Sequence, residues 1–479
     1  MPIRPALARC ACLRTPAVRA RTYATWSSVV EQATSALRNG APGAPADDES
    51  VAAYQRDPLA VVGEELSTMR STVSSLLGSG TQSLDRIAKY YFQAEGKNVR
   101  PMIVLLIAKA TNGLSPAWAA QRKAGLGSDA NIPISPAGVL QDVNPDAPPA
   151  AHIDTAVSSS GQLSHTILPT QRRLAEITEM IHVASLLHDD VIDASPLRRG
   201  APSAPSVFGN KLSILGGDFL LGRASIALAR LRDAEVTELM STVIANLVEG
   251  EVMQMKTEAT HVPVTDVAST EPTEETLSRF WTEPGQAFVH SERTPALPLF
   301  RQYLQKTYLK TASLIAKSAR SAAVLGGCSE HAALSHGLGS AAAAEAAELC
   351  DAVYQFGRNV GVAFQLVDDL LDFRSTSEAF GKPSGGADLQ LGLATAPVLF
   401  AWQEMPDSGI YDLVKRRFGE PGDVQKAMDI IHKSSGLERT AALARHHASE
   451  AAAALNRLPP SDARAALLRL NEQIITRVK

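Results

Sequence analysis

The chain has 479 residues, of which 45% are hydrophobic and 20% are charged, which is the composition of an ordinary globular protein with a large core. Its 46 basic and 50 acidic residues give a formal net charge of -4. This balance argues against a protein that holds nucleic acid by bulk charge, because neutralising phosphates needs a net basic surface.

The first stretch of the chain is basic and has no acidic residue before Glu31. Its arginines stand among Ala, Ser, Thr and Leu, which is the pattern of a mitochondrial presequence, with a disordered basic tail as the alternative. We predict that residues 1–30 are a presequence and that the protein is mitochondrial, in the matrix or associated with the inner membrane. The arginines are Arg4, Arg9, Arg14, Arg19 and Arg21.

Four cysteines in a chain of this length do not form a disulfide framework, and Cys10 and Cys12 fall within the predicted presequence. We expect Cys328 and Cys350 to be buried thiols in a reducing compartment. No run of about 18 to 20 uninterrupted apolar residues is present, so the sequence predicts no transmembrane anchor.

Most segments from Pro58 onward have the helical periodicity of apolar residues, and repeated period-2 alternation is hard to find. The pattern therefore predicts an all-α protein. The first helical face consists of Val62, Leu66, Met69, Val73 and Leu76.

Two stretches interrupt the helical pattern. Residues 115–168 are rich in Pro, Ala, Ser and Gly, and residues 257–301 are rich in Pro, Thr and Glu. We expect both to be irregular insertions in a single domain that covers residues 31–479. Residues 281–302 lack periodicity and are either a true insertion or a gene-model artefact.

An acidic cluster of three aspartates, Asp189, Asp190 and Asp193, ends a segment of helical periodicity. On a helix, Asp189 and Asp193 lie one turn apart on the same face, with Asp190 beside them. Like charges at this spacing repel one another, so a fold retains them on a solvated surface or around cations. The apolar residues of the segment are Leu174, Ile177, Ile181 and Ala184.

A second cluster, Asp368, Asp369 and Asp372, repeats the same D-D-x-x-D spacing and follows an apolar segment. One such cluster alone is more often a surface patch, whereas two copies with apolar flanks favour metal binding. Carboxylate oxygens suit Mg²⁺, which commonly bridges protein carboxylates and phosphate oxygens.

Basic residues occur where a phosphate ligand would need them. Lys97 and Arg100 are three residues apart, and Arg198 and Arg199 follow the first cluster. Arginine recognises phosphate oxygens bidentately and lysine acts as a point charge. The alternative for these residues is a solvated charged face.

Taken together, these motifs resemble those of the trans-prenyltransferases that make long-chain polyprenyl diphosphates, above all the fungal mitochondrial type that makes the ubiquinone side chain. The resemblance covers about residue 60 to the C-terminus, apart from the two insertions. It implies an all-α helical bundle of the isoprenoid-synthase type around a central apolar cavity. Beyond the two aspartate clusters its motifs are Gly96-Lys97-x-x-Arg100-Pro101, Leu197-Arg198-Arg199-Gly200, Lys310-Thr311, Phe364-Gln365 and Gly381-Lys382.

The resemblance also implies the roles of single residues. Asp189, Asp193, Asp368 and Asp372 would hold magnesium, three ions per active site, with Asp190 and Asp369 in support. The positions matching isopentenyl diphosphate ligands are Lys97, Arg100, His182 and Arg199. The positions matching ligands of the allylic partner, farnesyl or geranylgeranyl diphosphate, are Arg198, Lys310, Thr311, Gln365 and Lys382. A motif from Glu249 to Gln254 also resembles the family, and we expect it to serve helix packing first and the site second.

In this family, metal and cationic side chains stabilise the diphosphate leaving group while the allylic C–O bond breaks. Bulky aromatic residues four or five positions before the first aspartate stop chain growth early. Here these positions are Ser185 and Ala184, both small. The resemblance therefore implies a long all-trans product of about six to ten isoprene units, about C30 to C50. Close helix packing is an alternative role of the two small residues. Because such a product is apolar, we expect at most peripheral membrane contact.

Two hypotheses of different class remain at this point. The chain is either the catalytic elongating enzyme, as a homodimer or part of a heteromer, or a non-catalytic subunit that stabilises an active synthase. Retention of both clusters and of the basic motifs favours the first, because a structural subunit does not need clustered carboxylates. A class I terpene cyclase would explain one cluster but not the second.

Overall fold

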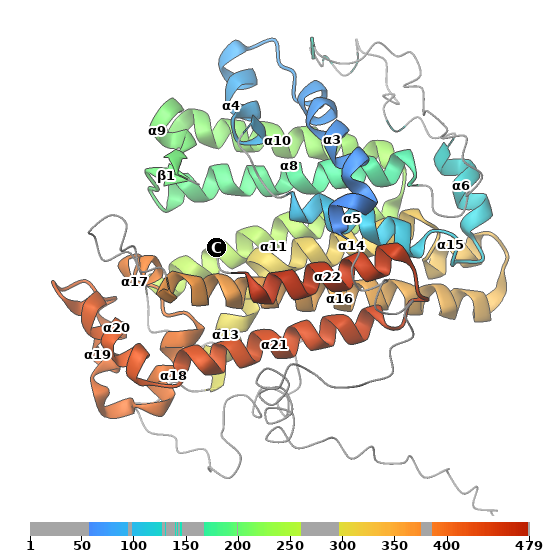
Figure 1. Ribbon diagram of the computed structural model, residues 1–479. Helices are drawn as coiled ribbons and strands as arrows, with labels where there is room; N and C mark the ends of the chain where they lie inside the picture. The colour runs from blue at the N-terminus through green and yellow to red at the C-terminus, as the bar shows by residue number, and fades with distance from the viewer. Residues whose placement is uncertain are drawn as a thin grey trace, which may run out of the picture. The chain divides into compact units, whose positions relative to one another are not determined.

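The computed structural model describes residues 57–93, 98–126, 130, 139, 141, 144–145, 167–198, 200–259, 297–374 and 386–477 (Figure 1). The predicted presequence lies outside these residues. Helices form nearly all the regular structure of the described part, which confirms the all-α prediction.

The N-terminal half of the described chain contributes the helices up to the first aspartate cluster and the three that follow it. They are α3 (Pro58–Leu76), α4 (Gln82–Gln93), α5 (Val99–Thr111), α6 (Trp118–Leu126), α8 (Pro169–Ile192), α9 (Ala204–Phe208), α10 (Asn210–Leu231) and α11 (Ala234–Ala259). Between α8 and α9 a short antiparallel pair is formed by β1 (Leu197–Arg198) and β2 (Ala201–Pro202).

The C-terminal half starts with α13 and continues directly into a π-helical turn, η2. Its elements are α13 (Leu297–Thr307), η2 (Tyr308–Ala312), α14 (Ser313–Leu325), α15 (Glu330–Ser335), α16 (Gly339–Arg374), α17 (Ala387–Gln390), α18 (Ala396–Glu404), the 3-10 turn η3 (Pro406–Ser408), α19 (Ile410–Lys415), α20 (Asp423–Lys433), α21 (Gly436–Leu455) and α22 (Asp462–Thr476).

Local sequence signals explain where α3 begins. Asp57 caps α3 by accepting a hydrogen bond from the Leu59 amide, and Pro58 occupies the first turn, where no amide donor is needed. Four of the five residues of the predicted α3 face are buried, and Leu76 packs against the core. The four apolar residues named in α8 are also fully buried, as predicted.

Both predicted insertions are helical at their edges, so the expectation of irregular structure was wrong there. Residues 118–126 form α6, whose Gly125 packs against Leu168. The chain remains helical through Ala259 in α11 and is helical again from Leu297 in α13, where Phe300 is fully buried. Packing against neighbouring helices overrides a weak periodicity. The remaining parts of the insertions lie largely outside the described residues.

The buried apolar residues form two main clusters, and α16 contributes to both. Its first half supplies Val353 and Phe356 to the larger cluster, and its second half supplies Leu366 and Phe373 to the other. At 1.5 Å per residue a helix of 36 residues is about 54 Å long, which is enough to bridge them. α21 lies along α16, as α10 lies along α8 (Figure 1).

Two other sequence expectations can be compared with the described residues. Cys328 and Cys350 are buried free thiols, as predicted, and burial raises the pKa of Cys328 to about 12. Among the helices described, α10 alone is long and apolar enough to cross a membrane, with a mean hydropathy of 1.4 in its most apolar window. It packs along α8. A helix in the core of a protein can have the same length and hydropathy as a membrane-spanning one.

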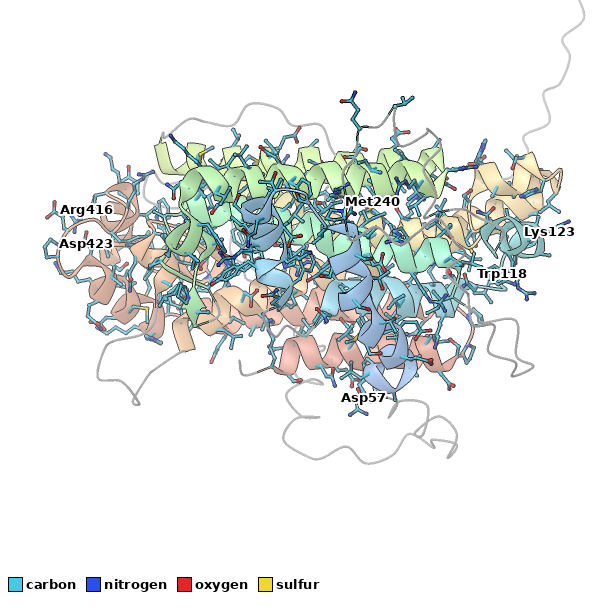
Figure 2. The ribbon with its side chains drawn as sticks, turned by 90° about the horizontal axis from the view of Figure 1, so that it is seen from above. Asp57, Trp118, Lys123, Met240, Arg416 and Asp423 are labelled. Atoms are coloured by element: carbon cyan, nitrogen blue, oxygen red, sulfur yellow. The ribbon has the colours of Figure 1, made fainter. Side chains whose placement is uncertain are left out.

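The segment after α18 is held by polar contacts on its exposed side. The Arg416 guanidinium donates two hydrogen bonds of 2.6 Å to the Asp423 carboxylate and so joins the end of α19 to the start of α20 (Figure 2). Met240, also labelled there, is by contrast fully buried in α11.

Acid sensitivity is expected at the contact between α16 and α21. His447 Nδ1 lies 2.9 Å from Asn359 Oδ1, and burial, with His446 and Arg358 nearby, lowers the pKa of His447 to about 3. Between this value and its ordinary 6.5, the unfolded chain binds a proton that the folded chain does not, so stability falls as the pH falls. His447→Gln should reduce the loss of unfolding free energy between pH 6.5 and 5, by up to about 1.4 kcal/mol per pH unit.

Urea unfolding at several pH values measures this slope. His432→Gln, at an exposed position of α20, is the matched control and should leave the slope unchanged. Equal slopes for His447→Gln and the unsubstituted chain would refute the assignment.

Candidate functional site

The first aspartate cluster lies at the C-terminal end of α8. Asp193 is the C-cap of the helix, and its amide donates a hydrogen bond of 2.8 Å to the Asp189 carbonyl, so the two residues are one turn apart. Asp190 is fully buried and faces a different neighbourhood. The predicted spacing of the outer pair is therefore present.

The outer carboxylates of this cluster, those of Asp189 and Asp193, are partly buried. Neither Asp189 nor Asp193 has a hydrogen bond or ion pair from its side chain within the described part of the chain. Burial raises the pKa of Asp189 to about 6, with Lys310 opposing the shift and Glu251 adding to it, and burial also raises the pKa of Asp193. Partly buried carboxylates without partners are suited to bind a cation.

The second cluster lies near the C-terminal end of α16 and differs from the first, because protein donors already contact its outer carboxylates. Asp368 forms an ion pair with Arg477, whose guanidinium also lies 4.1 Å from the centre of the Phe364 ring. Asp372 accepts hydrogen bonds of 2.9 and 3.0 Å from the amides of Ala387 and Asp388 at the start of α17.

Two of the residues predicted to bind isopentenyl diphosphate are in direct contact. Arg100 Nη1, on α5, lies 3.0 Å from His182 Nε2, on α8. Because the guanidinium has no acceptor, His182 Nε2 must be the acceptor. Burial raises the pKa of Asp368 in α16, and the Arg100 charge opposes this shift. Arg100 thus links the helix of the first cluster to that of the second.

Lys310 is held by two residues of α11. Its ammonium forms an ion pair with Glu251 and donates a hydrogen bond of 3.0 Å to Gln254 Oε1. Gly250 has no side chain to obstruct this contact, since a Cβ there would lie 2.7 Å from Lys310 Cγ. The Glu249–Gln254 motif therefore serves both packing and the site, more directly than the sequence suggested.

Thr311, the next residue of η2, points to the second cluster. Its hydroxyl donates a hydrogen bond of 2.9 Å to Gln365 Oε1, and Gln365 Nε2 donates one of 3.1 Å to Asp369 Oδ1. Gly361 permits the close approach of α16 and η2, since a Cβ there would lie 2.6 Å from Ala312 Cα. π-helical turns inside helices frequently occur at functional sites. Here η2 directs Lys310 towards the first cluster and Thr311 towards the second.

Arg198 is placed by the β1–β2 pair and contacts the first cluster. Its Nε donates a hydrogen bond of 2.7 Å to Asp190 Oδ1, and its Nη2 forms an ion pair of 2.6 Å with the same oxygen. The other basic residues of the predicted site, Lys97, Arg199 and Lys382, lie outside the described residues. Their roles stay predictions.

The two predicted chain-length residues differ in environment. Ser185 is half-buried and lies one turn before Asp189 on the same side of α8, with its hydroxyl donating to the His182 carbonyl. Ala184 is fully buried in the core. His188, expected to be a structural neighbour, lies 3.2 Å from the Ile214 carbonyl of α10 and contacts that helix.

The sequence alone did not identify several residues that surround the clusters. Tyr91 and Tyr303 bind the middle aspartates, Arg477 binds Asp368, and Asp388 lies beside Asp372 with its pKa raised to about 7 by burial and by Asp369 and Asp372. Each partner is distant in sequence or across a loop, so periodicity gives no signal for it.

The first cluster is suited to bind magnesium as an open site, in which protein carboxylates supply only some of the ligands. Among the described residues, no group of three or more carboxylate, imidazole or thiol side chains is arranged to hold a metal by itself. Mg²⁺ usually takes one or two carboxylates and completes its shell with water and substrate phosphate. The outer pair of α8 can supply those carboxylates, whereas Asp368 must first be released by Arg477.

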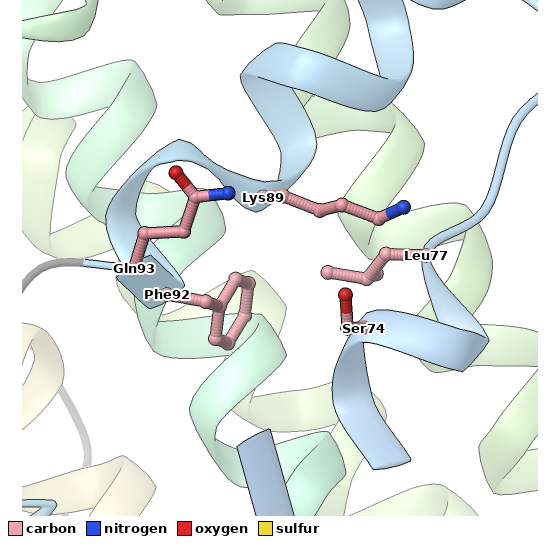
Figure 3. Close-up of a pocket in the computed structure, with 5 residues that line it drawn as sticks. All are labelled: Ser74, Leu77, Lys89, Phe92 and Gln93. Atoms are coloured by element: carbon pink, nitrogen blue, oxygen red, sulfur yellow. The ribbon is translucent and has the colours of Figure 1, made fainter. Parts of the chain in front are cut away.

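Two pockets lie in different parts of the fold. One, of about 10 Å³, is lined by Arg100, Phe364, Ile474 and further apolar residues, and it has room for about one water molecule. The other, of about 270 Å³, lies between α3 and α4 (Figure 3) and contains no residue of either cluster. Its lining residues are Ser74, Leu77, Lys89, Phe92 and Gln93.

Comparisons with known proteins identify one family. A family model described as polyprenyl synthetase matches residues 152–431. The chain is 50% identical to a probable mitochondrial hexaprenyl pyrophosphate synthase of Neurospora crassa, over 82% of this chain and 76% of that one. It is 40% identical to the mitochondrial hexaprenyl pyrophosphate synthase of Saccharomyces cerevisiae, over 82% and 85%.

The fold has a counterpart among solved structures. A polyprenyl synthase from Caulobacter crescentus, solved with calcium and isoprenyl diphosphate, aligns with a TM-score of 0.59 over 88% of this chain and 97% of that one, at 24% identity. This likeness establishes the helical bundle that the sequence implied.

Proposed function

Because the chain belongs to the polyprenyl synthetase family, we propose that the two aspartate clusters and the side chains around η2 form one active site for prenyl-chain elongation. The protein is a trans-polyprenyl diphosphate synthase, a prenyltransferase that makes long-chain polyprenyl diphosphate for the ubiquinone side chain. The observation that carries the site is the turn η2, whose Lys310 acts on the first cluster and whose Thr311 binds Gln365 beside the second.

The substrates are isopentenyl diphosphate and an allylic prenyl diphosphate, farnesyl or geranylgeranyl. Arg100 and His182, together with Lys97 and Arg199, bind the diphosphate of the first. Lys310, Thr311 and Gln365, with Arg198 and Lys382, hold the diphosphate of the second. Fixed cationic and hydrogen-bonding groups orient both substrates, and such orientation replaces a bimolecular encounter by a positioned one.

The cofactor is a divalent cation, magnesium, with three ions per site. Asp189 and Asp193 would hold it on one wall, and Asp368 and Asp372 on the other. Bound magnesium supplies positive charge to the leaving diphosphate. Charge from Lys310 and Arg198 adds to the same stabilisation, which acts on charge that develops in the transition state.

The reaction needs no protein nucleophile. The allylic C–O bond breaks and its electron pair leaves with the diphosphate, so an allylic cation remains. The double bond of isopentenyl diphosphate attacks this cation to form the new C–C bond, and a proton is lost to the released diphosphate. Apolar side chains such as Ile103 and Ile315, which line the pocket beside Arg100, keep water from the cation.

The protein is mitochondrial, as its relatives from N. crassa and S. cerevisiae are by name. We place it in the matrix or at the inner membrane, with peripheral membrane contact, because the product is apolar and must leave towards lipid. We further propose a homodimer or a heteromer. Exposed apolar residues on α10 and α11 support assembly with a second chain. They are Ile214, Leu215, Val248, Val252 and Met255.

Incubating the purified chain with farnesyl diphosphate, labelled isopentenyl diphosphate and magnesium tests the function directly. Chromatographic sizing should find an all-trans product of about six to ten isoprene units, by resemblance to the family. A cyclised product would identify a terpene cyclase. If neither farnesyl nor geranylgeranyl diphosphate is elongated or cyclised, the chain does not act as a homodimeric enzyme and is a subunit of a heteromer.

A further inference from the structure

The middle aspartate of each cluster is turned into the protein. Asp190 is fully buried and Asp369 is 3% exposed, whereas the outer aspartates are only partly buried. Buried carboxylates need hydrogen-bond partners, so the donors around these two decide how each cluster is held.

Asp190 has a partner on each oxygen. The Tyr91 hydroxyl, from α4, donates to Oδ2, and Arg198 donates a hydrogen bond to Oδ1 from Nε and forms an ion pair with it through Nη2. The Tyr91 oxygen also accepts a hydrogen bond of 2.8 Å from the Ala204 amide at the start of α9. Because this amide occupies an acceptor position on the tyrosine oxygen, the hydroxyl proton is directed towards Asp190.

Asp369 is held in a similar way by residues of different helices. The Tyr303 hydroxyl, from α13, donates a hydrogen bond of 2.5 Å to Oδ2, and Gln365 donates one to Oδ1. Tyr303 is itself buried and stacks on Phe300, so its ring has a fixed position.

The two arrangements share one pattern. Each middle aspartate accepts a tyrosine hydroxyl on one oxygen, and on the other a side chain that we assign to diphosphate binding, Arg198 or Gln365. The outer aspartates are one and three residues away on the same helical segment, so their direction depends on how the middle carboxylate is fixed. Partners one shell removed from a metal commonly orient its ligands.

We propose that Tyr91 and Tyr303 are positioning residues that fix the middle aspartate of each cluster, and through it both the outer metal-binding aspartates and the adjacent diphosphate-binding side chain. The proposal rests on the proposed function, since it assigns the outer aspartates to a divalent cation. The tyrosines themselves touch neither metal nor substrate.

Tyr91→Phe and Tyr303→Phe test the proposal, because each removes only the hydroxyl. Matched controls are Tyr90→Phe and Tyr354→Phe. The Tyr90 hydroxyl donates to the Pro202 carbonyl, and the Tyr354 hydroxyl contacts that of Tyr308. Binding of Mn²⁺ in the presence of inorganic diphosphate is measured by electron paramagnetic resonance, and the melting temperature is measured without metal.

The two test variants should bind Mn²⁺ about tenfold more weakly, the lower end of the effect of such partners, while the controls bind as the unsubstituted chain does. Because each test variant leaves a buried carboxylate oxygen without its donor, its metal-free melting temperature should be lower than those of the controls, but both variants should remain folded. Unchanged Mn²⁺ affinity in a folded Tyr91→Phe or Tyr303→Phe protein would overturn the proposal.

A double-mutant cycle separates positioning from a general loss of packing. If Tyr91 acts through Asp190, adding Tyr91→Phe to Asp190→Asn should weaken Mn²⁺ binding little further, whereas additive losses would count against the proposal. Failure of the proposed function is a different outcome: the unsubstituted chain would then neither bind Mn²⁺ with diphosphate nor elongate a prenyl chain.

Discussion

Replacing Asp189 by asparagine is expected to lower kcat/KM about 10³-fold, equivalent to about 4 kcal/mol of transition-state stabilisation. Asparagine has nearly the shape of aspartate but no charge, so the variant keeps the helix and loses the negative ligand for magnesium. Steady-state elongation of farnesyl diphosphate, with magnesium varied, measures the effect. Asp351→Asn, on the exposed part of α16 and paired with Arg457, is the control and should keep full activity.

The same substitution should not destabilise the metal-free protein. Burial raises the pKa of Asp189 to about 6, above its ordinary 3.8, so folding disfavours the charged form and the cost is complete above the folded pKa. At pH 8 Asp189→Asn removes this cost, and the melting temperature without metal should be equal or higher. Residual activity within tenfold of the unsubstituted enzyme, in a folded protein, would exclude Asp189 as a metal ligand.

A large residue at position 185 is expected to shorten the product by several isoprene units. Ser185 lies one turn before Asp189 on the same side of α8 and is half-buried, so under the proposed function a phenylalanine there would obstruct the growing chain. Chain initiation occurs at the aspartates, so the first condensations should continue. Thin-layer chromatography of the dephosphorylated products measures the length.

Two further variants control for packing. Ser185→Ala removes the hydroxyl that bonds the His182 carbonyl but leaves the space, so product length should not change. Ala184→Phe instead enlarges a fully buried residue, and overpacking should destabilise the fold by about 1–3 kcal/mol. A folded, active Ser185→Phe enzyme with products of unchanged length would show that this side of α8 does not face the growing chain.

The two clusters differ in a way that bears on metal loading. The outer carboxylates of α8 lack protein donors among the described residues, whereas Arg477 at the end of α22 pairs with Asp368. Ile474, one turn earlier, lines the small pocket beside Arg100. A metal ion at Asp368 Oδ1 would compete with this arginine.

Local sequence patterns predict most of the helices and the spacing of the aspartates on them. Helix geometry is local, so residues four apart lie on one face whatever surrounds them, and the apolar periodicity of α3 and α8 predicts which side is buried. The motifs that carry the family resemblance are equally local. They indicate Lys310, Thr311 and Gln365 as candidate diphosphate-binding residues from the sequence alone.

Helix packing, in contrast, sets which of these carboxylates are buried and bonded to other side chains. Tyr91 is 99 residues from Asp190, Tyr303 is 66 residues from Asp369, and Arg477 is 109 residues from Asp368. No periodicity relates residues at such separations, because helix packing and not helix geometry brings them together. The division of each cluster into partly buried outer aspartates and a buried middle aspartate is therefore a property of the packed helices.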